Sequence, residues 1–394
     1  MLPEKCTGCM ACYSICNFDA IKIVQNEKGF YVPQIDKTKC KNCGKCKDTC
    51  PENNKIDKEK CKAIYASWSK SNITRKSSTS GGIFSEISKV ILKQNGLVVG
   101  AMYNEHFEVE HNFIEKIEEL NKIQGSKYVQ SRIGDVYVRI KCELEKGKKV
   151  LFSGVGCQIA GLKKYLKKEY ENLITVDVLC HGAPSPRIFK EYIDRKKNNG
   201  EISNIRFRYK KPSWTVFSMR IDYKDGKIYQ KNTFDDEYIR LFLDDYITND
   251  VCSNCKYTGE ERVADITLAD FWGYVSEDAK YRNNEKGISL VLINSEKGNA
   301  IFNEVKDELV IIEKNIEEAK NGNQCLRKPF TKNKNYESFW KDYKENGYDF
   351  VVKKYFIKSK MSLKRRVSLM FNDFAFLIPK KARYKLIELR QKIK

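Results

Sequence analysis

Two short runs of the sequence share one cysteine spacing, and this repeat constrains the fold more than any other feature. Both runs follow the pattern C-x2-C-x2-C-x3-C, and each cysteine of CTGCMACYSIC recurs 34 residues later in CKNCGKCKDTC. The eight cysteines are Cys6, Cys9, Cys12, Cys16, Cys40, Cys43, Cys46 and Cys50. The repeat predicts a small domain made of two equivalent halves.

This spacing is that of the bacterial ferredoxin run, in which the fourth cysteine of each run binds the cluster of the other run. Three thiolates on one tight loop can face a single cubane, and a short helical stretch carries the fourth toward its partner. Zinc sites, the alternative, usually carry two C-x2-C pairs rather than two four-cysteine runs. The predicted ligands are Cys6, Cys9, Cys12 and Cys50 for one [4Fe-4S] cluster, and Cys40, Cys43, Cys46 and Cys16 for the other.

The whole chain has 394 residues, of which 41% are hydrophobic, so it is long enough for more than one globular domain. Its apolar run GLVVGAMY is too short to span a bilayer, and Cys6 follows the first residues without a signal-peptide pattern. We therefore expect a cytoplasmic protein. In a reducing compartment its 15 cysteines would be metal ligands or reactive thiols rather than disulfides.

The formal net charge is +21, and residues 351–394 alone contain 14 lysines and arginines against two acidic residues. Such a balance permits nucleic acid, acidic proteins, anionic cofactors or lipid headgroups as partners. No nucleic-acid-binding motif accompanies it, so we expect no nucleic-acid partner. The basic tail could lie on an anionic membrane surface or dock as helices on this protein or a partner, and we favour docking.

The pattern of the remaining chain predicts an α/β (mixed α+β) fold. Strand patterns such as AIYASWS and LVVGAMY alternate with helical patterns, which indicates a larger domain with a mixed, partly parallel sheet. We expect a dicluster ferredoxin-like domain over 1–58, the larger domain over 63–335 and a basic helical tail over 336–394.

The stretch SGVGCQIAG lies inside a predicted β-α-β unit. Strands joined by a helical crossover run parallel, so Cys157 and Cys180 should approach one edge of the sheet, where open α/β sheets bind ligands. Cys252 and Cys255 in VCSNCKY could complete a four-thiolate site there. Alternatively, Cys157 and Cys180 are buried structural residues and the C-x2-C pair is a separate metal loop. The unaccompanied Cys61, Cys142 and Cys325 are interpreted as core or incidental residues.

Two further stretches could bind an anion. In STSGG, residues 78–82, a hydroxyl residue followed by two glycines at a helix start suits a cofactor phosphate, or is a simple N-cap with a flexible lead-in. Lys127 in GSKYVQS could meet an anionic ring or phosphate, although taken alone an ordinary surface lysine is favoured.

Five motifs, in chain order, carry a family resemblance: KYVQS, VLFSGVGCQIAGL, DVLCHGAPSP, CSNCKY and ADITLADFWG. Over roughly 63–294 the chain resembles the coenzyme F420 hydrogenase/dehydrogenase beta-subunit family, with Val155-Gly156 and Ala269-Asp270 departing from the usual motifs. The resemblance implies FAD beside a third [4Fe-4S] cluster bound by Cys157, Cys180, Cys252 and Cys255. The implied flavin neighbours are Ser80, Gly81, Gly82, Lys127, Tyr128, Ser153, Gly154, Gly156 and Gln158.

The expected function is therefore that of an iron–sulfur flavoprotein oxidoreductase. It would pass electrons between a ferredoxin or another redox protein, its clusters and FAD, with hydride transfer to or from a small molecule such as coenzyme F420. Lys127, His181 and Asp270 are the candidate acid–base groups. The alternative is a non-catalytic iron–sulfur subunit that connects a partner enzyme to a ferredoxin pool.

Overall fold

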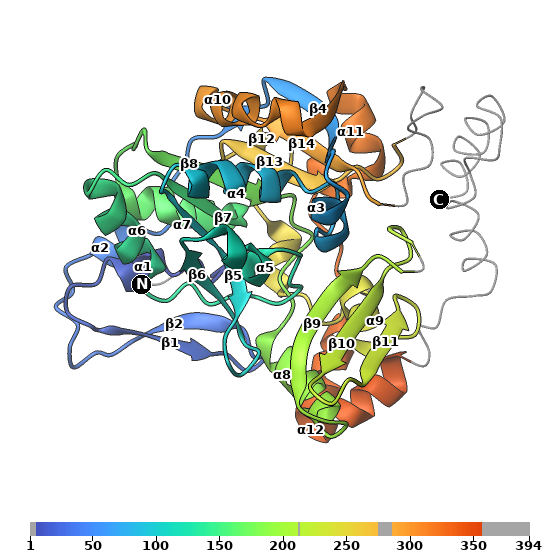
Figure 1. The fold of residues 1–394 in the computed structure, drawn as a ribbon. Coiled ribbons are helices and arrows are strands. Elements are labelled where there is room, and N and C mark those ends of the chain that lie inside the picture. The colour runs from blue at the N-terminus through green and yellow to red at the C-terminus, as the bar shows by residue number, and fades with distance from the viewer. Residues whose placement is uncertain (1–4, 212, 275–285, 357–394) are drawn as a thin grey trace.

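The computed structural model describes residues 5–211, 213–274 and 286–356. Its centre is an eight-stranded mixed sheet, so the predicted fold class is confirmed (Figure 1). Strands β5, β7, β8 and β13 run parallel to their neighbours in that group, and the outer pairs are antiparallel. In spatial order the strands are β15 (Leu309–Glu313), β4 (Ala63–Ser69), β14 (Ser289–Ile293), β13 (Ile266–Asp270), β8 (Leu173–Val178), β7 (Val150–Val155), β5 (Leu97–Tyr103) and β6 (Val109–Ile114).

Helices cover both faces of this sheet. On one face α4 (Ile83–Lys93) and α10 (Glu296–Glu304) bury apolar side chains such as Ile87, Ile91 and Phe302. On the other face α6 (Val136–Glu145) and α7 (Gly156–Leu166) pack against β7. Because the inner strands are buried on both sides, β5, β7 and β14 read as nearly continuous apolar runs, whereas β8 also carries the buried polar residues Thr175 and Asp177.

The β-α-β unit predicted around SGVGCQIAG is present. Strand β7 pairs in parallel with β8 from Val150↔Leu173 to Val155↔Val178, and α7 is the crossover between them. Both strands therefore end at the same edge of the sheet. Cys157 and Cys180, two of the candidate ligands, follow these strands at this edge.

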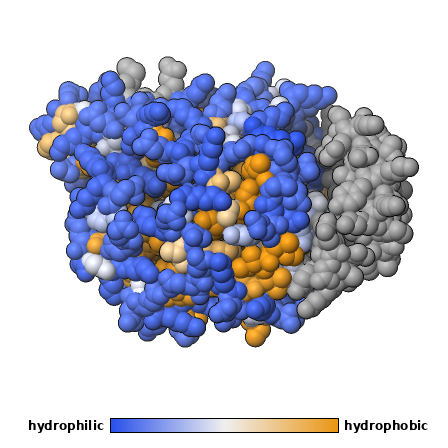
Figure 2. All heavy atoms as spheres, turned by 90° about the horizontal axis from the view of Figure 1, so that it is seen from above, coloured by the Kyte–Doolittle hydropathy of each residue, from blue (hydrophilic) through white to orange (hydrophobic). Residues whose placement is uncertain are grey.

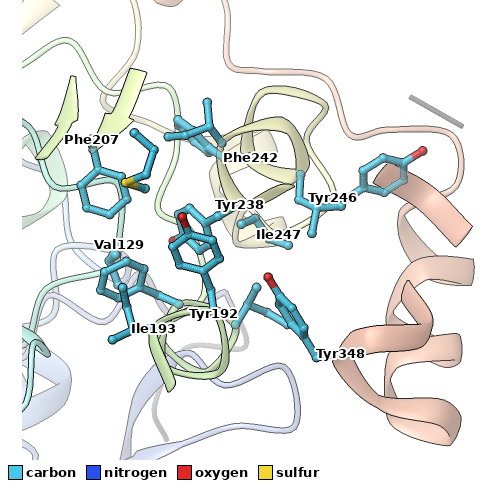
Figure 3. Close-up of a cluster of buried hydrophobic side chains, with 14 of the residues drawn as sticks. Val129, Tyr192, Ile193, Phe207, Tyr238, Phe242, Tyr246, Ile247 and Tyr348 are labelled. Atoms are coloured by element: carbon cyan, nitrogen blue, oxygen red, sulfur yellow. The ribbon is translucent and has the colours of Figure 1, made fainter. Parts of the chain in front are cut away.

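A second layer lies beside the main sheet, at the lower right of Figure 1. It consists of the antiparallel strands β9 (Ile202–Tyr209), β10 (Ser218–Tyr223) and β11 (Ile228–Asn232) with α8 (Pro186–Lys197), α9 (Glu237–Leu243) and α12 (Tyr336–Val351). Its core is aromatic: Phe207, Tyr192 and Tyr238 pack together, with Tyr348 of α12 against them (Figure 3). Helix α12, the start of the predicted tail, thus packs into this core, and 357–394 lie outside the described residues.

The N-terminal lobe is small and follows the cysteine repeat. It contains the hairpin β1 (Ile21–Gln25) and β2 (Tyr31–Ile35) and two one-turn helices, α1 (Ala11–Ser14) and α2 (Lys45–Asp48). Strand β3 (Glu59–Lys60) in the following segment pairs with β12 (Glu261–Arg262) of the body. The remaining helices are α3 (Asn72–Ser77), α5 (Leu120–Ile123) and α11 (Ile316–Gly322).

The described surface is mainly polar. Seen from above, most exposed side chains are hydrophilic, and apolar side chains gather toward the middle of that face (Figure 2). Among the described helices, none combines the length and apolar character needed to cross a membrane.

Candidate functional site

The first group of cysteines surrounds a cavity in the N-terminal lobe. Cys6, Cys9, Cys12 and Cys50 line it. Cys50 comes from the end of the second run, whereas the other three come from the first. The structure therefore places together the four thiols that the crossed ferredoxin pattern assigns to one cluster, and this donor set fits a [4Fe-4S] cubane.

The backbone conformation repeats with the cysteines. Gly8 and Asn42 occupy equivalent positions and have φ values of 74° and 51°, and Met10 and Gly44 have φ values of 64° and 77°. Left-handed residues at the same two places in each run make both loops turn tightly around their thiols. At Gly8 the packing is also tight, because a Cβ there would lie 2.4 Å from Gln130 Nε2.

The second group is more open to solvent. Cys43 is exposed, and Cys40 and Cys46 are half-buried. Burial raises the pKa of Cys46, and the Cys16 thiol contributes in the same direction, so the predicted partner from the first run lies within electrostatic range.

The third group assembles from three separate segments. Cys157 lies in the first turn of α7, Cys180 follows β8, and Cys252 belongs to the 3-10 helix Asp250–Asn254 that Cys255 ends. Burial raises the pKa of both Cys157 and Cys180, and each is raised further by the thiols of Cys252 and Cys255. The four predicted ligands thus lie within electrostatic range of one another at the sheet edge, as the shared-site interpretation expects.

Burial favours the protonated form of the most enclosed thiols in the first and third groups. Burial raises the pKa of Cys6 to about 11 and the pKa values of Cys12 and Cys252 to about 12. Iron binding would therefore release protons.

Within the described residues no group of three or more His, Cys, Asp or Glu is spaced for a single metal ion. A cubane holds its ligand sulfurs further apart than a single ion does, because each sulfur binds a different iron.

Helix α7 joins the first and third groups. A Cβ at Gly161 would lie 3.0 Å from both Cβ and Sγ of Cys9, so the glycine lets α1 pack directly on α7. One turn earlier on the same helix, the Cys157 thiol lies within electrostatic range of Cys9. The two candidate cluster sites are therefore neighbours in space.

Glu52 lies between the same two groups. It lines the cavity of Cys6, Cys9 and Cys12, and it also lines a second cavity that contains Cys255. Its side chain is only 10% exposed and forms an ion pair of 3.3 Å with Lys256.

The two loops predicted to contact the flavin lie side by side. The Ser126 amide donates a hydrogen bond of 2.8 Å to Thr79 Oγ1, which joins STSGG to GSKYVQS. Protein packing also explains one of the glycines, because a Cβ at Gly81 would lie 2.5 Å from Ser67 O. Gly82 has φ 95° at the N-cap of α4, a conformation that favours glycine.

Lys127 is partly buried and directed at the end of α5. Its ammonium donates hydrogen bonds of 3.1 Å to the carbonyls of Lys122 and Gln124, and burial lowers its pKa to about 7. The neighbouring Tyr128 accepts a hydrogen bond of 3.2 Å from Arg208 Nη1. Both residues thus have structural contacts, and their contact with a flavin stays a prediction.

The turn at SGVGCQIAG is also packed against protein. A Cβ at Gly156 would lie 2.7 Å from Tyr257 Cβ, and one at Gly154 would lie 3.0 Å from Gln158 Oε1. Gln158 accepts from the Val155 amide at 3.1 Å and donates to Ser131 Oγ at 3.0 Å. Ser153 O accepts a hydrogen bond of 3.0 Å from His111 Nε2. Close packing beside Cys157 is therefore enough to explain why glycine occupies both positions.

The two remaining acid–base candidates have close partners. One carboxylate oxygen of Asp270 accepts a hydrogen bond of 2.9 Å from Arg208 Nη1, and the other accepts one of 2.8 Å from Trp214 Nε1. His181 Nε2 lies 2.6 Å from Asp245 Oδ1. Burial lowers the pKa of His181, but the hydrogen bonds and charges of Asp245 and Cys325 together outweigh burial and raise this pKa to about 9.

Basic side chains gather beside the STSGG loop. Lys210 donates hydrogen bonds of 2.7 Å to both Arg75 O and Ser80 O. Burial lowers the pKa of Lys210 to about 7, and the charges of Arg75 and Arg208 lower it further while Asp270 opposes them. Lys210 thus lies within electrostatic range of two arginines and one carboxylate, and this excess of positive charge suits an anionic group such as a diphosphate.

Two residues near the site were missed from the sequence. Gln130, in KYVQS, accepts a hydrogen bond of 2.7 Å from the Tyr31 amide and thereby ties the N-terminal lobe to the body. Cys325, interpreted as a core or incidental residue, is buried in the core, and it also forms a hydrogen bond with His181 and lies within electrostatic range of the thiols of Cys180 and Cys255. No local spacing marks Cys325, whereas Gln130 lies inside a recognised motif.

The fold and the cysteine groups define an iron–sulfur electron-transfer protein of the oxidoreductase class. Residues 5–54 match the family model described as 4Fe-4S dicluster domain, and 147–319 match the model for the C terminus of the beta subunit of coenzyme F420 hydrogenase/dehydrogenase. The chain thus carries a dicluster domain in front of a segment that matches the coenzyme F420 hydrogenase/dehydrogenase beta-subunit family.

Among solved structures, the chain is similar to one from the xenon-derivatised F420-reducing [NiFe] hydrogenase complex of Methanosarcina barkeri. The two are 17% identical, the match covers 68% of this chain and 87% of that chain, and the TM-score is 0.45. A search of curated proteins found no match.

Proposed function

We propose that the protein is an iron–sulfur flavoprotein oxidoreductase that exchanges electrons with a redox protein and transfers a hydride to or from a small organic molecule. Coenzyme F420 is one candidate for that molecule. The observation that carries the proposal is the contact between α1 and α7, which makes the cysteine group of Cys9 a neighbour of the group of Cys157. A chain that binds redox centres at both groups would provide a short internal electron path.

Three four-cysteine groups would hold the [4Fe-4S] clusters. Their members are Cys6, Cys9, Cys12 and Cys50; Cys16, Cys40, Cys43 and Cys46; and Cys157, Cys180, Cys252 and Cys255. Bound clusters supply one-electron transfer, and bound FAD couples it to two-electron hydride chemistry. The chain itself supplies thiolates, excludes water from the buried groups and fixes their positions through α7.

FAD would bind beside the third group, next to the joined loops of STSGG and GSKYVQS. Arg75, Arg208 and Lys210 would balance the negative charge of its diphosphate, since only Asp270 opposes them in the interactions found there. The half-buried Lys127 would face an anionic part of the flavin, because its ammonium is held at this edge by the carbonyls of α5. Further predicted neighbours are Ser80, Gly81, Gly82, Tyr128, Ser153, Gly154, Gly156 and Gln158.

Anaerobic purification followed by iron, sulfide and flavin analysis tests the proposal. We expect about twelve irons and one FAD per chain, because three cubanes contain four irons each. About eight irons without flavin would contradict it and favour the non-catalytic subunit that only connects a partner enzyme to a ferredoxin pool.

A second test replaces one predicted ligand of the third group: Cys157→Ser should remove about four irons from each chain. Cys142→Ser is the matched control, since Cys142 is an exposed thiol of α6.

A further inference from the structure

The two halves of the cysteine repeat have opposite surroundings. In the first half Cys9, Met10 and Ala11 are buried against α6 and α7, and no residue from Cys6 to Cys16 is exposed. In the second half Cys43 is exposed, and a Cβ at Gly44 would meet no atom within 4 Å. The second half is therefore the side of the lobe from which an external protein can approach a redox centre.

Lysines surround this open half. The segment 37–47 contains five lysines and no acidic residue, all five are exposed, and the first run, from Cys6 to Cys16, contains no lysine. Within the described part of the chain, none of the five forms an ion pair or a side-chain hydrogen bond. We call them the lysine rim: Lys37, Lys39, Lys41, Lys45 and Lys47.

We propose that the lysine rim is the docking site of an acidic electron-carrier protein. The electron would enter at the group of Cys16, Cys40, Cys43 and Cys46 and continue to the buried group of Cys9 and then toward Cys157. This inference rests on the electron-transfer function proposed above. In each transfer the donor's redox centre is oxidised by one electron and the acceptor's is reduced by one, with no proton moved and no bond formed or broken.

Electrostatics gives the surface its selectivity. Exposed charges of one sign attract an oppositely charged protein, orient it before contact and raise its association rate, by ten- to a thousand-fold in strong cases. The attraction weakens with salt, because the screening length falls from about 30 Å at 0.01 M to about 8 Å at 0.15 M ionic strength. A small neutral reductant has no such dependence.

The test measures reduction of the bound clusters by stopped-flow absorbance in the whole iron-loaded protein. One reductant is a purified acidic ferredoxin, reduced beforehand, and the other is photoreduced deazariboflavin, which is neutral. The triple variant Lys37→Glu, Lys41→Glu, Lys45→Glu is compared with Lys93→Glu, Lys116→Glu, Lys306→Glu. The control lysines are also exposed and form no ion pair with a described residue, but they lie on α4, before α5 and after α10.

We expect the rim variant to be reduced by ferredoxin at least about tenfold more slowly at low salt, with a flattened salt dependence. The control variant should stay within about twofold, and the corresponding rim variant with three glutamines should be intermediate. Deazaflavin should reduce all variants equally, and equal iron content and equal electron paramagnetic resonance (EPR) spectra of the clusters would show that the rim variants are intact.

Equal ferredoxin rates in the rim and control variants would overturn the proposal. So would loss of binding to phosphatidylserine vesicles with an unchanged ferredoxin rate, since the rim would then recognise a membrane surface. If the unaltered protein accepted electrons from neither reductant, the electron-transfer function itself would fail, and the docking site with it. A normal deazaflavin rate with a rim-dependent ferredoxin rate supports the docking site whether or not flavin is bound.

Discussion

The phenolic hydroxyl of Tyr257 donates a hydrogen bond of 2.9 Å to Oε1 of Glu52, and this bond joins the N-terminal lobe to the loop that follows Cys255. Lys256 strengthens the junction by donating to Glu52 O at 2.7 Å. Burial and the charge of Glu52 raise the pKa of Tyr257, so its hydroxyl remains protonated and able to donate. A buried carboxylate is thus fixed between two groups of cysteines.

Replacing this carboxylate should change the reduction potentials of both neighbouring clusters. A negative charge beside a cluster disfavours adding an electron, so Glu52→Gln should raise the potentials of the clusters on the first and third groups by on the order of 50 mV. Potentiometric titration followed by EPR measures the shift. Glu59→Gln is the control, because Glu59 is exposed on β3. Unchanged or lowered potentials would contradict the role assigned to Glu52.

The two halves of the repeat should differ in their tolerance of an added methyl group. Gly8→Ala must push aside Gln130 and the Tyr31 carbonyl, whereas Gly44→Ala meets open space and suffers only the left-handed strain. We expect Gly8→Ala to lose about four irons and Gly44→Ala to keep its iron at a cost of about 1–2 kcal/mol. Iron analysis and anaerobic thermal unfolding distinguish them. Equal losses in both variants would show that the packing around Gly8 has no special importance.

The glycines of SGVGCQIAG should also be unequal. Gly156→Ala places a Cβ 2.7 Å from Tyr257 Cβ, next to the loop of Cys255, whereas Gly154→Ala meets the movable end of Gln158 at 3.0 Å. Overpacking of this kind costs about 1–3 kcal/mol, and we assign the larger value to Gly156. Loss of cluster absorbance during thermal unfolding is the measurement. A more severe effect at Gly154 would contradict this assignment.

His111 predicts a pH dependence of stability. Burial lowers its pKa to about 4, and Nε2–H faces Ser153 O, so the ring is neutral in the folded chain at neutral pH. In the unfolded chain the imidazole of His111 binds a proton near pH 6.5. The free energy of unfolding therefore falls as the pH drops from about 6.5 toward 4, by about 2 kcal/mol at pH 5. His111→Gln keeps a donor for Ser153 and should remove this dependence.

Denaturant unfolding of both proteins at pH 7 and pH 5 tests the prediction. The difference between the two pH values should be about 2 kcal/mol smaller in the variant. Equal differences in the two proteins would show that His111 does not carry the effect.

Local spacing and periodicity predicted much of this structure, and long-range contacts supplied the rest. The repeat predicted that Cys50 would lie with Cys6, and a crossover helix predicted the parallel pairing of β7 and β8, because both follow from neighbouring residues. The packing of Gly156 against Tyr257, by contrast, joins segments that are distant in the sequence. The hydrogen bonds that Asp270 accepts from Arg208 and Trp214 also join distant segments. Pairings between distant segments leave no period in the sequence.

The close packing of Cys9 against Gly161 fixes the position of the N-terminal lobe, and this affects how electrons would be transferred. A ferredoxin domain on a flexible tether delivers electrons by diffusing to its target, and its rate then depends on solvent viscosity. Here α1 packs directly on α7, and Gln130 holds the lobe by the Tyr31 amide. The separation between the first and third groups is therefore a fixed property of the fold, and electron transfer between them should proceed by tunnelling at a rate that viscosity does not change.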